Sequence, residues 1–149
     1  MKELNGQIKQ ASEVLQSFSN IMKEAGKWTQ KNASSLDLNV QQMVIINTLS
    51  VHKVLTVEKL VAQLQLSKNT INTQLETIVQ RGFVERTMND QREGQLSLTD
   101  EGRKKANMSI QNASSYKAMM RALQSFSEEE KAQLLAMHAR ILEGLKVEE

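Results

Sequence analysis

The chain has 149 residues and a formal charge of +2 at pH 7. This length suits one domain, or one domain with an additional dimerisation layer. The chain contains no cysteine, which excludes disulfides, thiolate metal sites and thiol-based redox sensing. A charge of +2 is a weak signal for nucleic acid, so any DNA binding must depend on a few well-placed contacts.

Hydropathy gives no sign of a membrane protein. No stretch approaches the roughly 18 apolar residues that cross a membrane, and no apolar signal region follows the first residues. We therefore expect a cytoplasmic protein with no membrane partner. The chain contains no proline, which favours long uninterrupted helices.

The first predicted helix covers residues 4–31. Its apolar residues follow a 4-3-4-3 spacing that is typical of a helix packing along another helix: Leu4, Ile8, Ala11, Leu15, Phe18, Met22 and Ala25. This face could pack on its own domain or on a second subunit. The rest of the fold is too small to cover a helix of this length, so we favour pairing in a two-fold dimer.

A loop over residues 32–38 should precede a short second helix. Asn39 and Gln42 form an Asn-x-x-Gln variant of the capping box, and the helix should run through Leu49. Residues 50–55 could then supply a short edge strand.

Residues 56–80 read as a helix-turn-helix. Thr56 is a suitable N-cap for the first helix, and Ser67 for the second. In the second helix Ile71, Leu75 and Ile78 recur at i, i+4 and i+7, which defines its inward face.

The opposite face of the second helix is polar. Counting about 100° per residue places Asn69, Asn72, Thr73 and Glu76 outward, with Lys68 and Gln74 on the flanks. Amides and hydroxyls at the start of such a helix can bond to base edges and phosphates in a major groove. The alternative is an ordinary solvated face.

A β-hairpin is predicted to follow. Gly82 should end the helix as a C′ residue, after which residues 83–86 and 95–98 alternate as two strands around a polar tip. A helix-turn-helix followed by such a hairpin is a winged helix.

The wing carries a recognisable spacing. Asp90 and Arg92 stand a few residues before Leu98, Thr99 and Gly102. This Asp-x-Arg followed by Leu-Thr-x-x-Gly resembles the multiple-antibiotic-resistance regulator (MarR) family of bacterial transcription factors, from about residue 39 to residue 102.

The resemblance implies a role for each wing residue. Arg92 would enter the DNA minor groove, and Asp90 would hold its guanidinium in place. A narrow minor groove concentrates negative potential, which suits an arginine. The alternative is a hairpin-tip salt bridge worth less than about 1 kcal/mol.

Two further helices complete the prediction. Thr99 should cap a helix from Asp100 towards Leu123, and Ser127 with Glu130 forms a capping box that opens the last helix. The last helix has an apolar stripe expected to pair with the N-terminal helix of the same or the other subunit: Leu134, His138, Ile141 and Leu145.

Catalytic and metal-binding patterns are sparse. His52 and His138 are the only histidines, and a zinc site would need both together with carboxylates, or ligands from a symmetry-related copy. No phosphate loop, serine elbow or acid pair is visible, so we predict neither an enzyme nor a metal or other cofactor.

We therefore predict a mainly α-helical chain with a small antiparallel β-hairpin and three parts. These are an N-terminal dimerisation helix in residues 1–35, a winged helix-turn-helix DNA-binding domain over residues 36–99, and a linking helix with a C-terminal dimerisation helix in residues 100–149. It should bind double-stranded DNA at a palindromic operator as a homodimer. The resemblance implies a repressor released by a small apolar or phenolic ligand. The alternative function is a winged helix that binds protein. The predicted DNA contacts are Thr56, Ser67, Lys68, Asn69, Thr70, Asn72, Thr73, Gln74, Arg86, Asp90 and Arg92.

Overall fold

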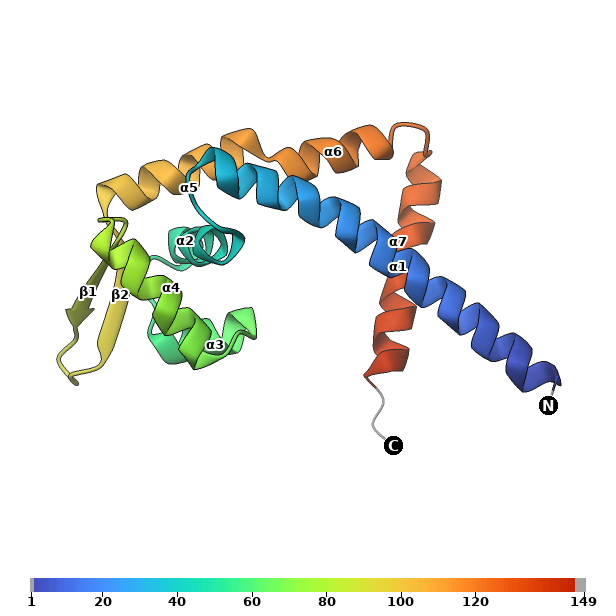
Figure 1. Ribbon diagram of the computed structural model, residues 1–149, viewed down its shortest axis with the longest axis horizontal. Coiled ribbons are helices and arrows are strands. Elements are labelled where there is room, and N and C mark those ends of the chain that lie inside the picture. The colour runs from blue at the N-terminus through green and yellow to red at the C-terminus, as the bar shows by residue number, and fades with distance from the viewer. Residues whose placement is uncertain (1, 147–149) are drawn as a thin grey trace. The chain divides into compact units, whose positions relative to one another are not determined.

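A computed structural model describes residues 2–146, which form seven helices and a two-stranded antiparallel sheet in that range. Two compact units share the chain, with the boundary between Ser115 and Tyr116. The elements follow in chain order (Figure 1): α1 Lys2–Ser35, α2 Val40–His52, α3 Val57–Leu64, α4 Lys68–Gln80, β1 Val84–Met88, β2 Gly94–Leu98, α5 Asp100–Asn112, α6 Ser114–Ala122 and α7 Glu128–Leu145.

The core of the first unit is made by the winged helix and the C-terminal end of α1. Its members are apolar side chains that are at most 8% exposed: Ala33, Leu36, Leu38, Met43, Ile45, Ile46, Leu49, Leu55, Leu60, Ile71, Leu75, Ile78, Phe83, Val84, Leu96, Leu98 and Ala106. The inward stripe predicted for the second helix of the helix-turn-helix is confirmed, since Ile71, Leu75 and Ile78 are fully buried. This core fixes α4 with its opposite face turned outward.

The hairpin has a regular register. Val84 pairs with Leu98, and Arg86 pairs with Leu96. Val84, Leu96 and Leu98 are buried together, so one face of the hairpin closes the core. The predicted mainly α-helical winged helix-turn-helix with a small β-hairpin is confirmed.

The predicted connections on either side of α2 differ from the structure. Helix α1 reaches Ser35, which shortens the expected loop over residues 32–38 to a turn. Helix α2 continues to His52, so no edge strand forms over residues 50–55, and only Leu55 bridges to Leu96. Lys53, at φ +66°, reverses the chain there without any glycine.

The helix predicted over residues 100–123 is interrupted. Helix α5 ends at Asn112, and Ala113 adopts a left-handed conformation with φ +37° before α6 begins. Its N–H still donates to Ser109 O at 3.0 Å, which closes the last turn of α5. The second unit therefore starts within a separate helix.

Candidate nucleic-acid interface

Local hydrogen bonds set where α3 and α4 begin. Thr56 Oγ1 accepts from the Lys59 N–H at 3.2 Å, and Ser67 Oγ accepts from the Thr70 N–H at 3.0 Å. Each hydroxyl satisfies an amide that the helix itself cannot bond. Both predicted caps are confirmed, and the positive end of α4 lies at Ser67.

The outward side of α4 presents a polar surface, which we call the reading face: Asn69, Asn72, Thr73 and Glu76. Asn69 and Thr73 are exposed and Asn72 is half-buried. Thr73 Oγ1 donates to the Asn69 carbonyl at 2.9 Å. The side-chain amides of Asn69 and Asn72 make no hydrogen bond within residues 2–146, so both remain available to a ligand.

Two predicted contacts at the start of α4 already have internal partners. Thr70 Oγ1 accepts from Ser67 Oγ at 2.8 Å, and Lys68 Nζ lies 3.7 Å from a Glu58 carboxylate oxygen. Both charged side chains of the latter pair are more than 60% exposed, so the pair contributes little and Lys68 can exchange to a phosphate at small cost.

Gln74 bonds to the N-cap residue of α2. Its Oε1 accepts from Asn39 Nδ2 at 3.0 Å, and the residue is half-buried. A glutamine that reads adenine uses both ends of its amide. In the structure the Gln74 amide oxygen therefore already has a partner at the start of α2, and the DNA contact expected of Gln74 stays a prediction.

The wing turn depends on Asn89, a residue that the sequence analysis did not single out. Asn89 Oδ1 accepts from the N–H groups of Gln91 and Glu93, each at 2.9 Å. Asn89 also pairs through its backbone with Glu93 and Arg92. Asparagine commonly forms turns at polar hairpin tips, so this role of Asn89 could have been predicted from the sequence.

Asp90 and Arg92 lie on this turn, and both side chains are exposed. Arg92 has φ +61°. No ion pair joins Asp90 to Arg92 in the part of the chain that the structure describes. The turn is therefore shaped by Asn89, while the guanidinium of Arg92 is free to reach a ligand.

A shallow groove lies between α4 and β1. Its volume is about 470 Å³, and its lining residues come from the reading face, the end of α4 and the first strand: Asn72, Glu76, Val79, Gln80 and Arg86. Arg86 is exposed on β1. The groove is thus lined both by Asn72 of the reading face and by Arg86, a cation on the wing.

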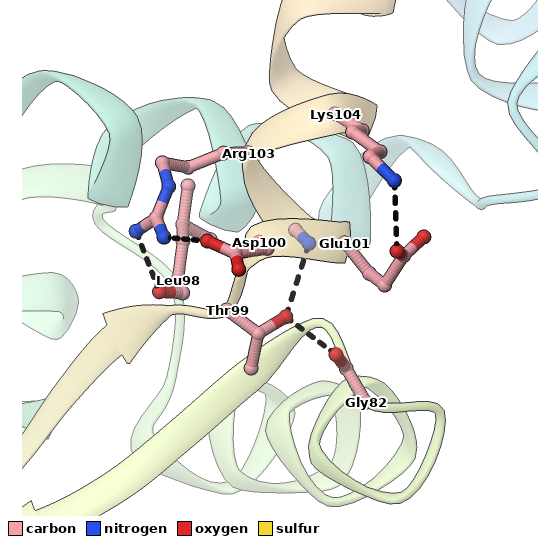
Figure 2. Close-up of polar contacts among 8 residues, drawn as sticks. Gly82, Leu98, Thr99, Asp100, Glu101, Arg103 and Lys104 are labelled. Carbon is pink, nitrogen blue, oxygen red and sulfur yellow. Dashed lines mark hydrogen bonds and ion pairs between the residues drawn. The ribbon is translucent and has the colours of Figure 1, made fainter.

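Thr99 attaches the base of the wing to α4 and α5 (Figure 2). Its Oγ1 accepts from the Gly102 N–H at 3.1 Å and donates to the Gly82 carbonyl at 2.5 Å. Arg103 adds a bond to the Leu98 carbonyl at 3.1 Å and an ion pair with Asp100. The end of α4 and the return strand are therefore fixed together.

The residues predicted for dimerisation lie on long helices with much apolar surface. Leu4, Ile8 and Leu15 of α1 are each more than half exposed. Ala11 is exposed and Phe18 half-buried. On α7, Leu134 is half-buried, whereas His138, Ile141 and Leu145 are exposed. None of residues 116–146 is buried.

Two further observations concern functions outside DNA binding. Among residues 2–146 no group of three or more metal-ligating side chains comes together. None of the described helices has the length and apolar character needed to cross a membrane.

The helix pair α3–α4 and the hairpin β1–β2 make this chain a winged helix-turn-helix protein. The model of the MarR family matches residues 38–93, which include α4 and the Asp90–Arg92 segment. The chain therefore carries a MarR-family domain, and the resemblance predicted from the wing motif is confirmed. This match supports a transcription regulator.

The chain is also similar to solved structures. The multiple antibiotic-resistance repressor of Listeria monocytogenes is 25% identical, with 93% of this chain and 96% of that chain covered at a TM-score of 0.64. A MarR of Staphylococcus aureus in complex with salicylate and kanamycin is 18% identical, with 91% of each chain covered at 0.77.

A mutant MarR from E. coli in complex with operator DNA is 17% identical, with 87% of this chain and 94% of that chain covered at a TM-score of 0.74. The identities to the Staphylococcus aureus and E. coli proteins are low, so these two similarities establish the shared fold alone. No curated protein sequence matches the chain.

Proposed function

We propose that this chain is a transcriptional repressor that binds a palindromic operator as a homodimer and is released by a small ligand. The observation that carries the DNA-binding part is the reading face, where the amides of Asn69 and Asn72 are accessible and make no internal hydrogen bond. The E. coli MarR bound to operator DNA has the same fold.

The chemistry of each element fits one part of a duplex. An asparagine amide can bond to both N6 and N7 of adenine in the major groove. Ser67, at the positive end of α4, and Lys68 suit phosphates. Arg92 on the wing turn suits a narrow minor groove, and Arg86 suits the backbone between the two grooves.

Charge sets how binding should behave. Residues 58–93 carry equal numbers of cations and acids: Lys59, Lys68, Arg81, Arg86 and Arg92 against Glu58, Glu76, Glu85, Asp90 and Glu93. A surface with this mixture attracts DNA weakly in a non-specific way. Affinity should therefore come from placed contacts, with a modest dependence on salt.

The homodimer is supported by the apolar surface of the long helices. Leu4, Ile8 and Leu15 are 58%, 58% and 64% exposed along one seam of α1, and α6 and α7 contain no buried residue. Pairing these helices with those of a second copy would bury this apolar surface. A palindromic operator then requires the two α4 helices to lie about one DNA turn, roughly 34 Å, apart.

Release by a ligand is supported by the Staphylococcus aureus MarR, whose structure contains salicylate. A small apolar or phenolic anion would act by preferring a conformation in which the two α4 helices no longer match successive grooves. Titrating salicylate into the operator complex tests this part. Unchanged affinity at saturating salicylate would remove salicylate as an effector.

Selection of bound duplexes from a random pool tests the proposal as a whole. We expect a consensus with two-fold symmetry, and binding that weakens as salt is raised. If the purified chain enriches no duplex at low salt, the winged helix is instead a protein-binding module, and the DNA proposal is wrong.

Two variants assign the contacts on the selected duplex. Arg92→Ala should weaken binding about tenfold without changing the consensus outside the flanking minor-groove positions. Asn72→Ala should relax the preference at one base pair, at a cost of about 1–3 kcal/mol. Lys9→Ala, on the exposed side of α1 away from the seam, is the control that should retain wild-type binding. Arg92→Ala binding as tightly as the wild type would exclude the wing contact.

A further inference from the structure

The turn between α1 and α2, residues 36–39, is fixed by buried side chains and backbone hydrogen bonds. Leu36 and Leu38 are 1% and 7% exposed, and both of their N–H groups donate to the Ala33 carbonyl at 3.0 Å. Asp37 between them has φ +59°. The turn therefore has one defined shape, with the carbonyls of Leu36 and Asp37 directed at neighbouring elements.

Helix α4 contacts this turn at two points. Asn39 Nδ2 donates to Gln74 Oε1 at 3.0 Å, and Arg81 Nη1 donates to the Asp37 carbonyl at 2.7 Å. Gln74 and Arg81 are seven residues apart, which is two helical turns or about 10 Å along one face. Two contacts at this separation fix the direction of α4 as well as its position.

A third contact comes from α5. Lys105 Nζ donates to the Leu36 carbonyl at 2.6 Å. The ring of Phe83, which is 8% exposed, interacts with both cations: Arg81 Cζ lies 4.9 Å and Lys105 Nζ 5.4 Å from its centroid. Each cation thus binds one carbonyl of the turn and the same aromatic ring.

The carboxylate of Asp37 is the weaker part of this arrangement. Arg81 Nη2 lies 3.1 Å from Asp37 Oδ2, but that side chain is 93% exposed, and exposed ion pairs contribute little. The carbonyls of Leu36 and Asp37 cannot be titrated or screened in the same way. The main-chain contacts should therefore dominate.

We propose that the α1–α2 turn sets the angle of α4, with Gln74, Arg81 and Lys105 as positioning residues for the reading face. These contacts lie away from Asn69 and Asn72 but fix the helix that carries them. The inference rests on the proposed DNA-binding function, and it gives Gln74 a structural role in place of base reading.

The test compares Arg81→Met and Lys105→Met with Lys104→Met. Lys104 is the matched control, because it lies next to Lys105 on α5 and pairs with Glu101 in solvent. Binding is measured to a duplex selected by the wild-type protein and to a scrambled duplex of the same composition, over a range of salt.

We expect both positioning variants to lose about tenfold in affinity for the selected duplex, the size of one well-formed base contact, with scrambled-duplex binding and the salt slope unchanged. Lys104→Met should match the wild type, Arg81→Lys should recover part of the loss, and Asp37→Asn should change affinity less than twofold. If the salt slope of Arg81→Met were lower by about one, Arg81 would contact phosphate and the proposal would be overturned. Wild-type affinity in both positioning variants would also overturn it.

Amide hydrogen exchange gives an arm that does not need DNA. Arg81→Met should speed exchange in the second half of α4 and in residues 36–39, whereas Lys104→Met should not. Unchanged exchange would overturn the inference. Absence of any wild-type duplex binding would instead contradict the proposed function, so the two failures are distinguishable.

Discussion

Gly102 lies in the first turn of α5, where the backbone of Phe83 leaves no room for a side chain. A Cβ at this position would lie 2.0 Å from the Phe83 carbonyl oxygen. The same carbonyl accepts from the Thr99 N–H at 3.0 Å. The glycine of the wing motif is therefore needed for close packing of α5 against the backbone of Phe83, the residue before β1.

Gly102→Ala should destabilise the fold by about 1–3 kcal/mol, because the backbone of Phe83 or α5 must move to admit the methyl group. Gly144→Ala is the control, since nothing lies within 4 Å of a Cβ there. That change should stabilise α7 by up to about 1 kcal/mol. Urea unfolding measures both, and equal effects at the two positions would contradict this explanation.

Single residues that act through neighbours in sequence could be predicted. The caps at Thr56 and Ser67 and the reversal at Gly82, with φ +84°, each follow from one residue and a helix end. The bond between Asn39 and Gln74 joins residues 35 positions apart and leaves no periodic trace. Gln74 was therefore assigned to DNA from its angular position alone.

At the scale of elements, α4 has a buried apolar stripe and begins at its N-cap, Ser67. In the proposed complex this end of the helix lies near a DNA phosphate. Ser67→Ala should lower stability by about 1 kcal/mol, because the Thr70 N–H loses its acceptor. Ser67→Asp separates the two roles, since aspartate caps equally well but repels phosphate.

Thermal unfolding and duplex binding should therefore move apart in these variants. Ser67→Asp is expected to retain wild-type stability and to lose affinity for DNA. Ser67→Ala should lose stability and keep more of its affinity than Ser67→Asp. If Ser67→Asp bound the selected duplex as well as the wild type, this end of α4 would not lie near phosphate.

Element boundaries were harder to predict than elements. The break before α6 lies at Ala113 and the reversal after α2 at Lys53, both non-glycine residues at positive φ. Neither has the glycine or proline that usually marks such a site. A prediction based on local pattern therefore continues the helix through Ala113 and proposes a strand after Lys53.

At the scale of the whole molecule, the two units differ in how they can be stable. The first has a contiguous apolar core. In the second unit none of residues 116–146 is buried, and even the large apolar side chains of Leu135, Leu142 and Leu145 are each more than half exposed. Helices with this surface gain most of their stability from packing against other helices. The proposed homodimer supplies that packing.

Leu15→Lys tests the homodimer on the seam of α1, where Leu15 is 64% exposed. A charge there must stay hydrated and would prevent helix pairing, so we expect monomers in sedimentation equilibrium. Asn20→Lys adds the same charge on the opposite side of α1 and should stay dimeric. Of the two variants, only Leu15→Lys should lose operator affinity. A monomer contacts one half-site, whereas a dimer contacts both at once. A dimeric Leu15→Lys protein would show that α1 does not form the subunit interface.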